Sequence, residues 1–117
     1  MLFNDRRQHP RFKCTGHAEL QVAADAQPVP ARITNLSKGG CLIELQRPHS
    51  LEHNMTVELA FRVNLLPFRV RVLASWIKSD TVVGFQFATL TERAQRQLEE
   101  LIEELSAVRR RHVVAYR

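Results

Sequence analysis

Two arginines near the start of the chain, Arg7 and Arg11, stand four residues apart with Pro10 between them. A guanidinium can donate two parallel hydrogen bonds to a phosphate, or meet the O6 and N7 acceptors of a guanine edge. Pro10 restrains the backbone and disfavours an ordinary helix at this point. The spacing suits a clamp for an anion, whereas the charge alone favours a solvated basic tail, because chain termini are often poorly ordered.

A second polar group stands between two apolar segments and consists of Asn35, Ser37, Gly39 and Gly40. Asn and Ser favour tight turns because their side chains hydrogen bond to nearby backbone groups. Two successive glycines permit a positive φ and the close approach of a ligand. Taken alone, this pattern predicts a hairpin turn.

The motifs of several enzyme classes are missing from the sequence. It has no P-loop, no GxSxG elbow, no HExxH and no paired metal ligands. His49 and His53 are four residues apart, but Pro48 and Asn54 predict a loop there rather than a metal-binding helix. We therefore expect a protein that is not an enzyme and that holds no metal or cofactor.

The composition indicates one small domain that prefers anionic partners. The 117 residues are 44% hydrophobic and 25% charged, with a net charge of +5. No apolar run approaches the roughly 18 residues of a membrane span, and the apolar start at residues 1–5 is too short for a signal peptide. Cys14 and Cys41 lack metal-type spacing and are expected to stay reduced, although they could in principle pair. We expect a cytoplasmic protein.

Apolar and polar residues alternate in several short segments, which is the period of a half-buried strand. Six or seven short antiparallel strands joined by brief loops predict a mainly β protein, either a barrel or a sandwich. The clearest segments cover residues 17–23, 31–36, 41–45, 55–63, 68–77 and 81–88.

Thr91 is predicted to cap a helix, because after it the apolar residues recur at steps of three and four positions. The apolar positions are Ala94, Leu98, Leu101, Ile102, Leu105 and Val108. A helix with one apolar face must cover something, either the barrel or a second helix in a dimer seam. Two heptads are too few for an independent coiled coil, so packing on the barrel is favoured and a monomer or weak dimer is expected.

The two polar groups, in this order, resemble the motifs of the PilZ domain family. Arg7 and Arg11 match RxxxR, while Asn35, Ser37 and Gly40 match [DN]xSxxG, with Asn where many members have Asp. The segment at residues 83–87 resembles the family's late strand before its closing helix. The resemblance covers about residues 6 to 105.

This resemblance implies a six-stranded antiparallel β-barrel closed by a C-terminal α-helix that binds the bacterial second messenger cyclic di-GMP. Arg7 and Arg11 would clamp guanine and phosphate, Asn35 and Ser37 would hydrogen bond to the nucleotide, and Gly39 and Gly40 would give it clearance. The implied parts are a flexible segment (1–16) carrying RxxxR, the barrel (17–90), the helix (91–110) and a basic tail (111–117).

Two further residues extend the implied site. Arg6 resembles the arginine that accommodates an intercalated dimer of the ligand, which implies two ligands per chain; a solvated Arg6 is the alternative. Trp76 is the only tryptophan and stands near the end of a predicted strand. Its indole either stacks on a purine or packs in the core or at the rim of the barrel.

The implied function is a receptor or adaptor that changes conformation on binding cyclic di-GMP and signals to a protein partner that the sequence does not identify. One alternative is a degenerate PilZ-like adaptor that binds protein without a nucleotide. Another is a nucleic-acid-binding barrel, which is disfavoured because such surfaces interleave aromatic and basic residues. Here four phenylalanines occupy positions expected to face inward, namely Phe61, Phe68, Phe85 and Phe87.

Overall fold

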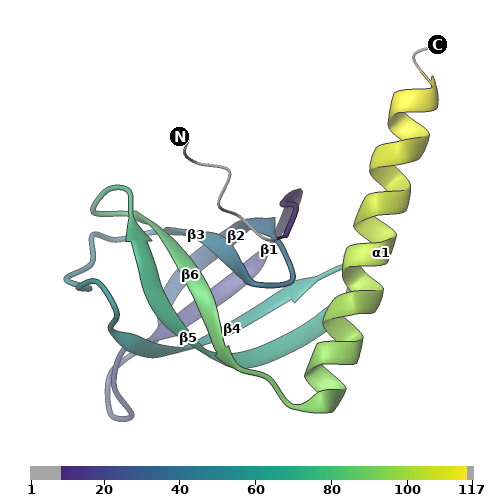
Figure 1. Cartoon of the computed structure of the whole chain (residues 1–117). Helices are drawn as coiled ribbons and strands as arrows, with labels where there is room; N and C mark the ends of the chain where they lie inside the picture. Colours follow the sequence, from purple (N-terminus) through teal and green to yellow (C-terminus); the bar gives the residue numbers. More distant parts are fainter. Residues whose placement is uncertain (1–8, 116–117) are drawn as a thin grey trace.

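Six antiparallel strands close into a β-barrel, and one helix follows them (Figure 1). The computed structural model describes residues 9–115, with side chains described from residue 9 to residue 108. Within that range the strands are β1 (Phe12–Gln21), β2 (Val29–Leu36), β3 (Gly40–Leu45), β4 (Thr56–Val63), β5 (Leu66–Ile77) and β6 (Val82–Thr89), and the helix is α1 (Glu92–Ala115).

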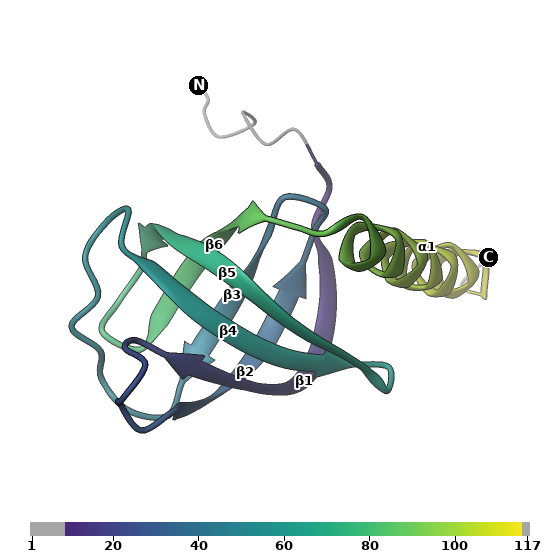
Figure 2. The ribbon, with the colours of Figure 1, turned by 90° about the horizontal axis from the view of Figure 1, so that it is seen from below.

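The strand order around the barrel is β1-β2-β3-β6-β5-β4, and the barrel closes where β1 pairs with β4. Figure 2 shows the strands wrapping around a common interior. The predicted six-stranded antiparallel barrel is therefore confirmed. Because β3 pairs with β6 rather than with β4, the turn before β3 lies beside the middle of β6, and β6 in turn pairs with β5.

Inward-facing residues of all six strands form one hydrophobic core. The alternation predicted for the β4 and β5 segments is observed, since Val57, Leu59 and Phe61 are buried, as are Phe68, Val70, Val72 and Ala74. Phe61 and Phe68 stack with ring centroids 4.8 Å apart. These rings stabilise the core and are not displayed beside the basic residues, which speaks against a nucleic-acid-binding surface.

The first strand begins at Phe12, earlier than the predicted start at His17. Phe12 is buried and pairs with Leu36, but the register shifts between Lys13 and Gly16. This bulge breaks the alternation on which the sequence prediction depended. The segment that carries Arg11 therefore leads directly into the barrel wall.

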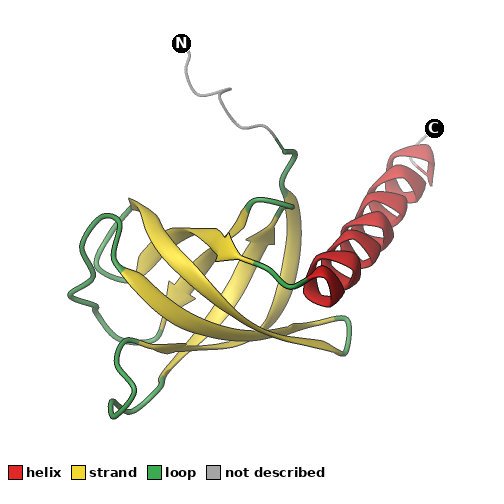
Figure 3. Ribbon diagram, turned by 60° about the horizontal axis from the view of Figure 1, so that its bottom comes forward, coloured by secondary structure: helices red, strands yellow, loops and turns green. Residues whose placement is uncertain are grey.

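The helix begins where the sequence predicted, since the Ala94 amide donates to Thr91 Oγ1 at 3.0 Å. Leu98, Leu101 and Ile102 are buried and belong to the barrel core, which confirms that the first part of the apolar face packs on the barrel. Val108 is exposed, and Figure 3 shows α1 extending away from the barrel. No helix in the described part of the chain is long and apolar enough to cross a membrane.

Candidate functional site

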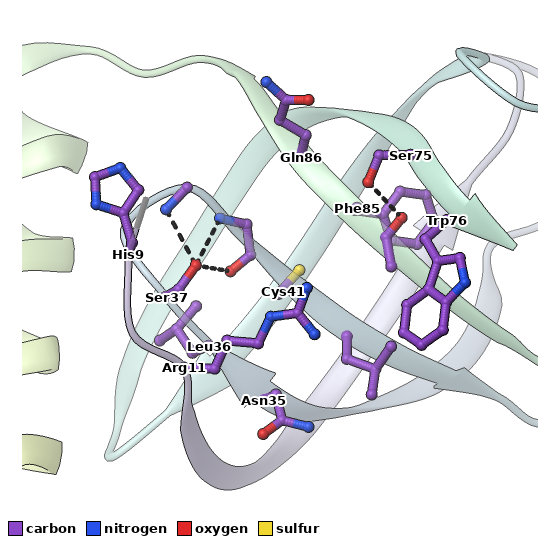
Figure 4. A pocket seen from close by; sticks show the side chains of 14 residues that line it. His9, Arg11, Asn35, Leu36, Ser37, Cys41, Ser75, Trp76, Phe85 and Gln86 are labelled. Carbon is purple, nitrogen blue, oxygen red and sulfur yellow. Dashed lines mark hydrogen bonds between the residues drawn. The ribbon is translucent and has the colours of Figure 1, made fainter. Parts of the chain in front are cut away.

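A pocket of about 350 Å³ lies on the barrel where the segment before β1 meets β2, β3, β5 and β6 (Figure 4). Its size falls within the range of small-molecule sites, roughly 300–1,000 Å³. The residues that line it are His9, Arg11, Asn35, Leu36, Ser37, Gly39, Gly40, Cys41, Leu42, Ser75, Trp76, Gly84, Phe85 and Gln86.

The polar lining of this pocket suits an anion. Arg11 extends into the pocket from the segment before β1, near the Asn35 side chain (Figure 4). Among the described residues that line the pocket there is no Asp or Glu. A guanidinium in such a lining can donate hydrogen bonds to phosphate or to a guanine edge.

The turn between β2 and β3 is organised around the Ser37 hydroxyl. Ser37 Oγ accepts hydrogen bonds from the amides of Gly39 and Gly40, each at 3.2 Å, and lies 3.3 Å from the Gly40 carbonyl oxygen, to which it donates. The Ser37 side chain and backbone together are only 8% exposed. The hydroxyl therefore shapes the turn through nearby backbone groups, as the sequence predicted, and its direct contact with a ligand stays a prediction.

The two glycines of this turn make close packing contacts and lack the positive φ that the sequence allowed them, while clearance for a ligand stays a prediction. None of the described glycines has a positive φ, so conformational freedom is not what positions 39 and 40 require. A Cβ at Gly40 would overlap the backbone oxygen of Phe85, whereas a Cβ at Gly39 would meet only the His9 ring, at 3.1 Å. Gly40 thus permits close packing of β3 against β6, and Gly39 accommodates His9.

Trp76 forms the opposite wall of the pocket and is 47% exposed. It pairs with Gly84, and a Cβ at Gly84 would stand 3.5 Å from the indole Cε3, so the ring packs over this glycine. Lys78 Nζ lies 5.8 Å from the ring centroid. The indole therefore packs at the rim of the barrel, which is one of the two sequence interpretations, and it also presents surface to the pocket. Stacking on a purine stays a prediction.

The structure brings together six of the predicted site residues, Arg11, Asn35, Ser37, Gly39, Gly40 and Trp76. Arg6 and Arg7 lie outside the described residues. The sequence prediction missed His9, Ser75 and Gln86. His9 stands within RxxxR and could have been proposed, but Gln86 reaches the site only because its strand position pairs with Gly40.

Cys41, which lines the pocket, and Cys14 are free thiols. Burial raises the pKa of Cys14 to about 11, and burial together with the neighbouring Cys14 raises the pKa of Cys41 far above its ordinary value. Strand β2 lies between them, so two strand spacings of about 4.8 Å separate their backbones, more than the roughly 7 Å that a disulfide spans. Neither thiol is poised for reaction at neutral pH.

A protein-family model described as PilZ domain matches residues 5–104. Among solved structures, YcgR from Escherichia coli in complex with c-di-GMP superposes with a TM-score of 0.77 at 20% identity, over 96% of this chain and 51% of that chain. The PilZ domain of YcgR from Escherichia coli with c-di-GMP superposes with a TM-score of 0.70 at 19% identity, over 93% of this chain and 98% of that chain.

The K. pneumonia MrkH-c-di-GMP complex gives a TM-score of 0.77 at 16% identity, over 93% of this chain and 55% of that chain. The chain therefore spans about half the length of the longer YcgR and MrkH structures. No curated protein sequence matches the chain significantly. These likenesses establish the shared fold.

Proposed function

The chain belongs to the PilZ domain family, and from this membership we propose that it is a receptor for cyclic di-GMP that signals to a protein partner. Members of the family are generally non-catalytic receptors. YcgR and MrkH, which share the fold, form complexes with this nucleotide. Family and fold support the proposal, and the pocket supplies the chemical argument.

The observation that carries the proposal is the meeting of Arg11, the turn at residues 35–40 and Trp76 in one pocket. Cyclic di-GMP presents two phosphates and two guanines. Arg11 can donate to a phosphate or to guanine O6 and N7, the Asn35 amide can both donate and accept at a base edge, and Trp76 offers a surface for stacking. Each chemical group of the ligand thus has a complementary side chain.

Within this proposal Asn35 contacts the nucleotide directly and Ser37 acts mainly through the turn. A direct hydrogen bond from Ser37 to the ligand would have to replace its bond to the Gly40 carbonyl. Arg7, four residues before Arg11 in sequence, would supply a second guanidinium. Arg6 would add a third, which supports an intercalated dimer of the ligand.

The proposed signal is a change in the segment at residues 1–11, which folds over the nucleotide and thereby forms a new surface for a protein partner. The segment leads straight into β1, whose first residue Phe12 is buried in the core. A change in this segment would therefore be transmitted to the barrel through the short stretch of chain that precedes Phe12.

Isothermal calorimetry with cyclic di-GMP tests the proposal. Saturable binding to the wild-type protein, abolished in Arg7→Ala and Arg11→Ala, would support a receptor. Arg62→Ala is the matched control, because Arg62 is exposed on β4 and does not line the pocket. If the wild-type protein binds no nucleotide by calorimetry and by a second method, the chain is instead an adaptor that binds protein alone.

A further inference from the structure

The imidazole of His9 lies against Gly39, so the segment before β1 touches the turn between β2 and β3 (Figure 4). A Cβ built on Gly39 would stand 3.1 Å from His9 Cδ2 and 3.9 Å from His9 Nε2. Among the described residues, chain neighbours aside, only His9 comes within 4 Å of that position. The absence of a side chain at Gly39 therefore leaves the space that the imidazole occupies.

The backbone of Gly39, on which this ring packs, is held by two hydrogen bonds. Its amide donates to Ser37 Oγ at 3.2 Å, and its carbonyl accepts a hydrogen bond from the Phe87 amide at 2.9 Å. Its φ is not positive, so an alanine would suit the backbone at this position and would disturb only the His9 contact.

Arg11 lies between two anchors. On one side Phe12 is buried in the core and pairs with Leu36; on the other, His9 contacts Gly39 and Pro10 restrains the backbone that joins His9 to Arg11. With both flanks held, the Arg11 backbone has little freedom, and its side chain is directed into the pocket.

We propose that His9 is a positioning residue of the binding site, which docks the segment before β1 on Gly39 and thereby holds Arg11 toward the pocket. The inference rests on the proposed function. The contact involves protein atoms alone, so residues 9–11 dock without the nucleotide, and the change proposed on binding concerns the part of the segment that precedes His9. A docked segment has less conformational freedom left to lose when the ligand binds, which strengthens binding.

Calorimetry with cyclic di-GMP on five proteins separates positioning from direct contact: the wild type, His9→Ala, His9→Phe, Gly39→Ala and the double variant His9→Ala/Gly39→Ala. We expect His9→Ala and Gly39→Ala each to weaken binding by roughly threefold to tenfold. The double variant should be no weaker than either single variant, because both changes remove one contact. His9→Phe keeps a planar ring for Gly39 and should bind nearly as the wild type does.

Two outcomes of that experiment would overturn the proposal. Additive losses in the double variant would mean that His9 and Gly39 act separately. Binding by His9→Phe as weak as by His9→Ala would mean that the imidazole nitrogens contact the ligand directly.

The docking itself is measured without nucleotide, by comparing the Gly39 amide signal of uniformly ¹⁵N-labelled wild type and His9→Ala in NMR spectra. A clear shift is expected because the aromatic ring is removed from that amide's surroundings, and an unchanged signal would refute the docking. If the wild-type protein binds no cyclic di-GMP, the receptor proposal fails, while the Gly39 signal still decides whether His9 docks the segment.

Discussion

Gly40 at the start of β3 lies so close to the backbone carbonyl of Phe85 on β6 that a β-carbon at position 40 would overlap that oxygen. The two strands pair at this point, Gly40 with Gln86 and Cys41 with Phe85. The last glycine of the polar turn therefore serves the packing of the barrel on which the pocket is built. The neighbouring Gly39 serves the contact with His9.

Substitution of Gly40 by alanine should destabilise the fold. The added methyl group would force β3 away from β6, an overpacking that typically costs about 1–3 kcal/mol or more in the free energy of unfolding. Denaturant unfolding followed by circular dichroism measures the change. Gly39→Ala is the matched control and should alter stability by less than about 0.5 kcal/mol, so equal losses in the two variants would contradict the assignment.

Substitution of Ser37 by alanine should loosen the turn and weaken nucleotide binding together. The amides of Gly39 and Gly40 would lose the oxygen that accepts from them, with an expected loss of about 1–3 kcal/mol in unfolding free energy because Ser37 is buried and both glycines are partly buried. Thermal unfolding and calorimetry with cyclic di-GMP measure the two effects.

Ser79→Ala is the control for that experiment. Ser79 Oγ accepts from the amides of Thr81 at 3.2 Å and Val82 at 3.1 Å, in an exposed turn that does not line the pocket. Its loss should lower stability without changing affinity for the nucleotide. A Ser37→Ala protein with full affinity would show that the turn does not need its hydroxyl to form the site.

The barrel was predictable because its signal is local: alternation of period two marks the strands, and Thr91 marks the start of the helix. The family resemblance implied one site for Arg11, Asn35, Ser37 and Trp76, and these four residues line one pocket of the structure. Their contact with a ligand stays a prediction. The start of β1 was predicted wrongly, because a bulge between Lys13 and Gly16 hides the alternation there.

What the sequence could not provide is the register between strands that are distant along the chain. Gln86 reaches the pocket because β6 pairs with β3 opposite Gly40, and that pairing depends on how the barrel closes. The reasons for the two glycines are equally non-local, since Phe85 and His9 lie far from them in sequence. A sequence motif shows which residue stands at a position, but it does not show which distant residue packs against it.

Substitution of Leu65 by glycine should stabilise the protein. Leu65 has a φ of 68° in the turn between β4 and β5, and it is 85% exposed, so its side chain gains little from packing. A left-handed backbone costs an L-residue about 1–2 kcal/mol, of which the greater chain entropy of glycine cancels roughly 0.5–1 kcal/mol. We expect a net gain of up to about 1.5 kcal/mol in thermal unfolding experiments.

Leu65→Ala is the control for this backbone effect. Alanine removes the exposed apolar group but keeps the β-carbon that disfavours a positive φ. It should leave the melting temperature close to that of the wild type. A glycine variant no more stable than the alanine variant would show that the turn is not strained.

Substitution of Arg6 by alanine should change the stoichiometry of binding. If Arg6 supports an intercalated dimer of cyclic di-GMP, the wild-type protein binds two nucleotides per chain and Arg6→Ala binds one. Calorimetry at protein concentrations well above the dissociation constant gives the ratio directly. A wild-type ratio of one would refute this role for Arg6 while leaving the receptor proposal intact.

The single tryptophan gives an optical test of the pocket itself. Trp76 is half exposed at the pocket wall, and the protein has no other tryptophan, so its emission reports on this site alone. Stacking of a guanine on the indole should quench the emission as cyclic di-GMP is added. Base stacking contributes about 1–3 kcal/mol, so Trp76→Ala should weaken binding by roughly fivefold or more.

Trp76→Phe separates stacking from packing. Phenylalanine keeps an aromatic face, so calorimetry should show affinity much closer to that of the wild type than to that of Trp76→Ala. Unchanged emission on saturation, combined with wild-type affinity in Trp76→Ala, would mean that the indole only packs on Gly84 at the rim. Quenching that follows the same binding curve as the calorimetric heat would place the base against the indole.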